Sequence, residues 1–129
     1  MNEQEKIRYN AATAVFKLAV GTFNSGVHRT LNIKPKGQGW VQCAGKDSQL
    51  GLMCKPDKVR TSIEYFKIAY EIFPDIVALN QIAIAHEILG EADRAYESYQ
   101  RMKVQAEVER NKTYSEAADH GMRNNQRKL

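Results

Sequence analysis

The sequence predicts an all-α domain of helical hairpins, with one loop insertion that contains both cysteines. Apolar residues recur at three- and four-residue steps along most of the chain, which is the period of amphipathic helices. Pro74 and Gly90 interrupt this period where one helix ends and the next begins. Similar small and large residues also recur about 33–35 positions apart, a period typical of repeated helix pairs. We therefore expect about two helical hairpins followed by a terminal helix.

The composition is that of one ordinary globular domain, residues 1–129, large enough to bury a core without metals. The formal net charge is +4, and the basic excess lies in residues 25–60, which hold seven Lys or Arg against two Asp. No apolar run reaches the roughly 18–20 residues that span a bilayer, so we expect no transmembrane segment. The first residues are polar and lack the apolar stretch of a signal peptide. The protein is therefore expected to be cytosolic, or to have lost a signal.

Residues 3–24 predict the first helix, which ends at Asn24-Ser25-Gly26. One apolar face contains Ile7, Ala11, Ala14, Val15 and Leu18. The neighbouring face contains Tyr9, Ala12, Phe16, Val20 and Phe23. Because both faces are apolar, we expect this helix to be sandwiched between other elements.

Residues 25–57 form the predicted insertion, which has a different composition. It contains five of the eight glycines, two of the three prolines, both cysteines and the only tryptophan. Residues 31–34 alternate weakly, and residues 39–43 and 50–54 are candidate short strands on either side of a polar turn. A loop of this length in a compact domain is usually functional when it is ordered.

The remaining helices follow from turn and capping signals. The second helix begins at residues 55–57, with Asp57 as N-cap, and stops before Pro74. Asp75 caps a third helix over 76–89, and a fourth runs from about 91 to 110. A C-terminal capping helix lies within 112–124, where Thr113 and Glu116 have the spacing of a capping box. Since no Gly or Pro separates the last two, one long bent helix over 91–124 is an alternative.

The repeat can be followed residue by residue. One set of equivalent positions pairs Ser62, Glu64, Phe66 and Ala69 with Ala95, Glu97, Tyr99 and Met102. Another pairs Leu79, Ile82 and Ala83 with Tyr114, Ala117 and Ala118. This pattern resembles the tetratricopeptide repeat family, whose packing positions correspond here to Leu79, Ile82, Ala83, His86, Gly90, Ala95, Tyr99 and Met102. His86 replaces a usual large aromatic, Met102 replaces a usual small residue, and an insertion of about 37 residues splits the first repeat.

The resemblance implies a groove that holds a peptide or partner helix, lined by the first helix of each pair. The positions that match are Asn10, Ala14, Lys17, Asn80, Ile84, Glu87, Ser115 and Asp119. Some members clamp a carboxylate with Lys and Asn at such positions, but Glu87 and Asp119 place negative charge in the same groove. The alternative is that these residues are solvated polar faces of helices.

Cys43 and Cys54 are the only cysteines, and we expect them to form a disulfide rather than to stay free. A loop this short would be stabilised by about 3 kcal/mol. A disulfide indicates a periplasmic or secreted protein, whereas free thiols would fit the cytoplasm. No CxxC or HxxxH spacing is present, so neither a metal nor another cofactor is expected.

The insertion also contains a basic and aromatic set of residues that we call the basic loop: Lys34, Lys36, Trp40, Lys46 and Lys55. An aromatic ring among cations can stack on bases and contact phosphates, so nucleic-acid or anionic-surface binding is the alternative function. However, the rest of the chain has no basic excess and no recognition helix. The simpler interpretation is that Trp40 and Leu52 pack the insertion against the first two helices.

The sequence lacks a glycine-rich phosphate loop and the common hydrolase motifs, so we expect no enzyme. We expect a non-catalytic adaptor or scaffold with a protein or peptide partner. So few repeats make a shallow groove, which makes self-association a further expectation. The cysteines and the habits of the family indicate a bacterial envelope or secretion assembly as the setting.

Overall fold

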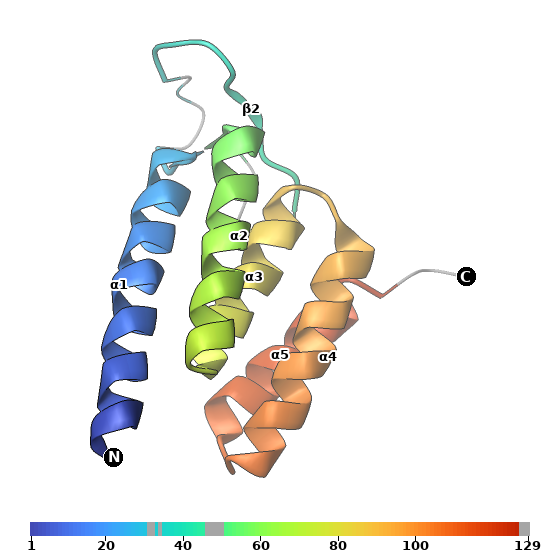
Figure 1. The fold of residues 1–129 in the computed structure, drawn as a ribbon. Coiled ribbons are helices and arrows are strands. Elements are labelled where there is room, and N and C mark those ends of the chain that lie inside the picture. The colour runs from blue at the N-terminus through green and yellow to red at the C-terminus, as the bar shows by residue number, and fades with distance from the viewer. Residues whose placement is uncertain (31–32, 34, 46–50, 127–129) are drawn as a thin grey trace.

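The computed structural model describes residues 1–30, 33, 35–45 and 51–126. It is mostly helical (70%), with five helices packed as hairpins. They are α1 (Glu3–Ser25), α2 (Pro56–Ile72), α3 (Ile76–Ile88), α4 (Ala92–Val108) and α5 (Lys112–Asn124). Each helix packs against the next one in the chain, and the insertion lies over the end of the molecule where α1 stops and α2 begins (Figure 1). The predicted helical hairpins are confirmed.

The insertion adds a small antiparallel sheet, so the fold is not purely α-helical. Its strands are β1 (Val27–His28), β2 (Val41–Gln42) and β3 (Met53–Cys54), in the order β1-β3-β2. Val27 and Val41 lie opposite Cys54 on its two sides. The strands expected within 39–43 and 50–54 are present. Strand β1 was not predicted, because two residues directly after a helix are too short to show alternation. The weak alternation at 31–34 falls mainly on residues outside the described part.

Two predicted helix caps are wrong. Helix α2 begins at Pro56 with Lys55 as the N-cap residue, so Asp57 lies in the first turn. Proline has a fixed φ and no N–H, which suits this first helical position. Helix α5 is capped by Asn111, whose side chain accepts a hydrogen bond from the Tyr114 N–H at 3.1 Å, and not by a Thr113 capping box. The predicted Asp75 cap of α3 is confirmed, with the Val77 N–H at 2.9 Å.

Helix α4 ends at Val108 and α5 begins at Lys112, so residues 91–124 form two helices and not one long bent helix. Arg110 adopts a left-handed φ of 55°, and the Asn111 N–H donates to the Ala106 carbonyl at 2.8 Å. This closes α4 in the way that a glycine usually does. The returning α5 approaches α4 at Gly121, where an added Cβ would lie 2.5 Å from the Tyr99 ring. A glycine is therefore needed for this close packing.

The core has two parts. One joins α1, α2, α3 and the insertion and includes Phe23, Val59 and Phe66. The other joins α3, α4 and α5 around Leu79 and Met102. Within the first part, Phe16 meets Phe66 edge to face with ring centroids 5.3 Å apart. Met102 is fully buried, although the resemblance leads one to expect a small residue there.

The prediction that α1 is sandwiched is wrong. Its buried residues Ala12, Ala19 and Phe23 lie on one side of the helix. On the opposite side, Ile7 is 64% exposed and Leu18 is 53% exposed. No other described element covers this stripe. An apolar face alone indicates burial only when another element is available to pack against it.

Candidate partner-binding site

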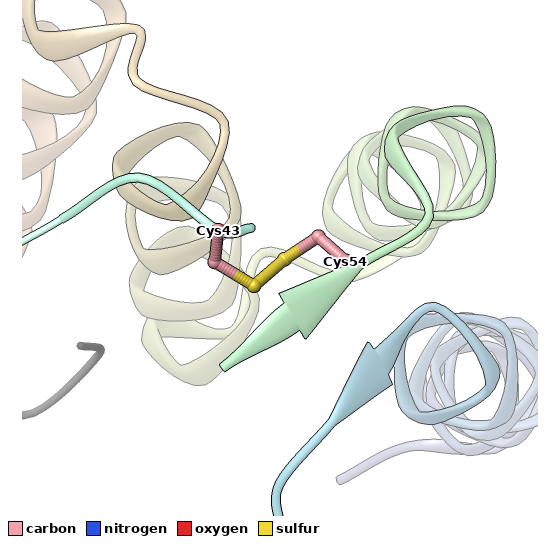
Figure 2. The surroundings of a disulfide bond; sticks show 2 residues. All are labelled: Cys43 and Cys54. Atoms are coloured by element: carbon pink, nitrogen blue, oxygen red, sulfur yellow. A yellow bond between two sulfur atoms is a disulfide. The ribbon is translucent and has the colours of Figure 1, made fainter. Parts of the chain in front are cut away.

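The predicted disulfide between Cys43 and Cys54 is confirmed. It joins the segment after β2 to the end of β3, immediately before α2 begins (Figure 2). Both residues are buried in the core. The Cys43 N–H donates to the Leu52 carbonyl and the Ala44 N–H donates to the Ile88 carbonyl, both at 2.8 Å. The first bond closes the base of the insertion, and the second holds it against the C-terminal end of α3.

Trp40 is half-buried within the insertion and has neighbours on its ring. The Lys55 ammonium lies 5.1 Å from the ring centroid, at cation–π distance, and His28 meets the ring edge to face at 6.1 Å. Lys36 is exposed. Lys34 and Lys46 lie outside the described residues. Trp40 therefore contacts one of the two described lysines of the basic loop, Lys55.

The predicted groove residues differ in their exposure and in the hydrogen bonds that their side chains make. Asn10, Ala14 and Lys17 on α1 are exposed, while Asn80 and Ile84 on α3 are partly exposed. Glu87 has internal partners: it accepts a hydrogen bond from the Tyr99 hydroxyl and another from Asn125 Nδ2 at 3.1 Å. Burial, together with this bond to Glu87, raises the pKa of Tyr99 well above its ordinary value. Glu87 thus links α3 to α4 and to the end of α5.

The two groove positions on α5 are also part of an internal network. Lys103 Nζ donates to Ser115 Oγ at 2.8 Å and to Asp119 Oδ2 at 2.9 Å. The hydrogen bond to Asp119 is the main cause that raises the pKa of Lys103. Both bonds connect α4 to α5. The fully exposed residues of the predicted groove therefore all lie on α1, whereas those on α3 and α5 are partly buried.

Beside these exposed residues, an apolar pocket of ≈ 220 Å³ opens between α1, α2 and α3. Its lining residues are Tyr9, Ala12, Thr13, Phe16, Ala69, Phe73, Asp75, Val77 and Ala78. The Tyr9 and Phe73 rings stand edge to face with centroids 5.4 Å apart. Tyr9 is 42% exposed even though it is aromatic. The pocket is therefore a concave apolar surface that is open to solvent.

The sequence did not single out this pocket as a site. The sequence predicts that Tyr9, Ala12 and Phe16 pack between helices. The signal that could have found it is the run of small side chains, Ala12, Ala69 and Ala78, set among aromatic residues. Small residues normally allow helices to approach closely. Here α1 and α3 do not pack extensively against each other, and the small residues line the space between the helices.

No family model, curated protein or solved structure matches this sequence. In the part of the chain that the structure describes, no helix is long and apolar enough to cross a membrane. The same residues contain no group of three or more His, Cys, Asp or Glu side chains arranged to hold a metal ion.

Proposed function

We propose that this protein is a non-catalytic interaction module that binds a protein or peptide partner at the apolar pocket between α1, α2 and α3. The observation that carries the proposal is the open apolar pocket with a 42% exposed aromatic at its edge. Concave apolar surfaces with a few polar groups at the rim are the usual form of ligand sites. The exposed Asn10 and Lys17 lie on the same helix as Tyr9, outside the pocket lining.

We further propose that the hairpins are tetratricopeptide-like, with α1/α2 and α3/α4 as the pairs and α5 as a terminal helix. Support comes from the burial of equivalent residues. Ser62, Phe66 and Ala69 on α2 are buried, as are Ala95, Tyr99 and Met102 on α4. Glu64 and Glu97, at a further equivalent position, are both exposed. A shared burial pattern at a period of about 33 residues is what repeated helix pairs require.

The pocket chemistry indicates what part of a partner would bind. Aromatic and aliphatic side chains form most of the lining, and the space has the scale of a large apolar side chain. The lining contains one charged residue, Asp75, whose carboxylate is already used to cap α3. We therefore expect an aromatic or branched aliphatic side chain of the partner to insert between Tyr9 and Val77. Burying such a side chain contributes about 1.5–3 kcal/mol.

A test can use peptides without knowing the natural partner. A displayed peptide library is selected on the wild-type protein, and the enriched peptides are measured by titration. Thr13→Phe places a ring into the pocket from α1 and should abolish binding, because Thr13 lines the pocket. The matched control Ala11→Phe adds the same ring at an exposed position of the same helix, outside the pocket lining and the predicted groove, and should retain binding.

Thermal melts of both variants establish that they fold. Enriched peptides that share an aromatic or branched aliphatic residue, and that lose affinity only for Thr13→Phe, support the proposal. Peptides that bind Thr13→Phe as well as wild type would place the interaction elsewhere, and the pocket would no longer carry the function.

The alternative of nucleic-acid or anionic-surface binding by the basic loop gains no support from the described residues. Lys55 lies over the Trp40 ring, so a base that stacks there would have to displace the lysine. We retain the adaptor proposal instead. The buried disulfide supports an oxidising compartment. A bacterial envelope or secretion assembly is the setting that we propose.

A further inference from the structure

A second hollow lies between α2 and α4. Its lining is basic, whereas the lining of the pocket between α1, α2 and α3 is apolar. Its volume is ≈ 230 Å³. It is lined by Arg60, Thr61, Ile63, Glu64, Lys67, His86 and Arg94. Three cationic side chains from two helices thus line one hollow, and Glu64 is the one carboxylate among the lining residues. None of the residues of the apolar pocket takes part, so the two hollows are separate.

The two guanidinium groups are positioned by a shared partner. Glu91 Oε2 lies 3.1 Å from Arg60 Nη1 and 4.0 Å from Arg94 Nη1. A guanidinium has five N–H donors, and each of these contacts uses one nitrogen of its group. Several donors on each arginine are therefore left for another acceptor. Because α2 and α4 are both fixed in the core, the two groups are held near each other before any ligand arrives.

His86 extends this arrangement into the interior. It is 5% exposed, and its Nδ1 lies 3.1 Å from Glu91 Oε1. The sequence already marked His86 as unusual, since the family resemblance places a large aromatic there. A histidine at this point adds a polar group to the lining of the hollow, where an aromatic hydrocarbon would offer none.

Lys67 adds the third cation, two helical turns after Arg60 on α2. It lies 3.7 Å from Glu64, one helical turn before it on α2, and both side chains are at least half exposed. An exposed pair of this kind is weak, so the ammonium can exchange this partner for a ligand at little cost. Two guanidinium groups and one ammonium line this hollow, and together they match an acceptor with several oxygens in different directions.

We propose that this hollow, formed by Arg60, Lys67 and Arg94 beside His86, binds a phosphate group. A tetrahedral dianion offers oxygens to all three cations at once, whereas a planar carboxylate offers two oxygens in one plane. The phosphate is either the free ion or a phosphate ester on a partner. This inference goes beyond the interaction module proposed above and does not depend on its apolar pocket.

The test is a titration of the intact, disulfide-bonded protein, followed by the backbone amide signals of residues 60–67 and 86–94. Inorganic phosphate, phenyl phosphate and acetate are compared at constant ionic strength, with chloride as the balancing anion. We expect phosphate to shift these signals saturably and acetate to leave them unchanged. Tighter binding of phenyl phosphate identifies an ester as the preferred source, and tighter binding of inorganic phosphate identifies the free ion.

Charge-removing variants locate the site. Arg94→Gln and Lys67→Gln should each weaken phosphate binding by about tenfold or more, the scale of one lost charge-assisted hydrogen bond. Lys67→Gln is the safer variant, because Lys67 does not touch the Glu91 cluster and its loss should leave the fold intact. The control Arg8→Gln removes the same charge from an exposed position on α1. Equal shifts with acetate, or equal weakening by Arg8→Gln, would overturn the proposal.

Discussion

Reduction of the Cys43–Cys54 disulfide should lower the free energy of unfolding and the melting temperature by amounts that follow from the length of the loop it closes. The two cysteines are 11 positions apart in sequence. Restricting a loop of this length in the unfolded chain is worth about 3 kcal/mol in the chain-entropy model. For a chain of 129 residues, the unfolding entropy converts this value into a loss of roughly 10 °C in melting temperature.

The assay compares thermal melts, followed by circular dichroism, of the oxidised protein and of protein reduced under mild denaturant and refolded. Thiol counting confirms complete reduction before each melt. The double variant Cys43→Ala with Cys54→Ala serves as the control, and its melting temperature should not respond to reductant. Equal melting temperatures for the oxidised and fully reduced protein would refute the reasoning, because the disulfide would then place no effective constraint on the unfolded chain.

Hydrogen exchange gives a local readout of the same perturbation. The Cys43 and Ala44 N–H groups bond to the Leu52 and Ile88 carbonyls. Reduction should speed exchange at these two amides more than in the centre of α2, because it releases the base of the insertion. Uniform acceleration throughout the chain would instead indicate a purely global effect.

Three further predictions concern packing and charge. Gly121→Ala should reduce the free energy of unfolding by about 1–2 kcal/mol in urea titrations, since the clash of its Cβ with the ring 2.5 Å away exceeds the gain in helix propensity. The control Gly21→Ala has no heavy atom within 4 Å of the added Cβ and should stabilise α1 by up to about 1 kcal/mol; destabilisation there would contradict this account. Phe66→Ala should cost about 3–5 kcal/mol because the ring is fully buried, whereas Ile68→Ala, 45% exposed on the same helix, should cost far less. Burial alone would raise the pKa of Glu91, but hydrogen bonds from His86 and Arg60 outweigh it and hold the pKa below the ordinary 4.5. Its stabilising contribution is therefore present above that value and lost as the pH falls through the folded-state pKa. The difference in the free energy of unfolding between wild type and Glu91→Gln should vanish in acid. A difference that grows in acid would contradict the lowered pKa assigned to Glu91.

The helices could be predicted because their signals are local. The three- and four-residue apolar period, Pro74 after α2 and Gly90 after α3 are all properties of neighbouring residues. The disulfide could also be predicted, since only one pairing of two cysteines exists within the chain. By contrast, the break at Arg110 carries no proline or glycine, and its left-handed backbone is decided by the packing of α5 back onto α4.

The candidate sites were much less predictable. The groove residues named from the resemblance include Glu87, Ser115 and Asp119, but their hydrogen-bond partners Tyr99, Asn125 and Lys103 come from other helices. Both hollows likewise combine residues from helices that are far apart in sequence. A sequence pattern shows which face of a helix is apolar or charged, but not which neighbour covers that face.

The same division holds for the chain as a whole. By itself, the sequence determined the helical class, the approximate helix limits, the insertion and its disulfide, because each depends on residues close together or on a unique pairing. Only the tertiary structure decided that Ile7 and Leu18 face solvent, that Tyr9 borders an open pocket and that Arg60 meets Arg94 across Glu91. Those facts depend on the distance and rotation between helices, which are set by the packing of many side chains together.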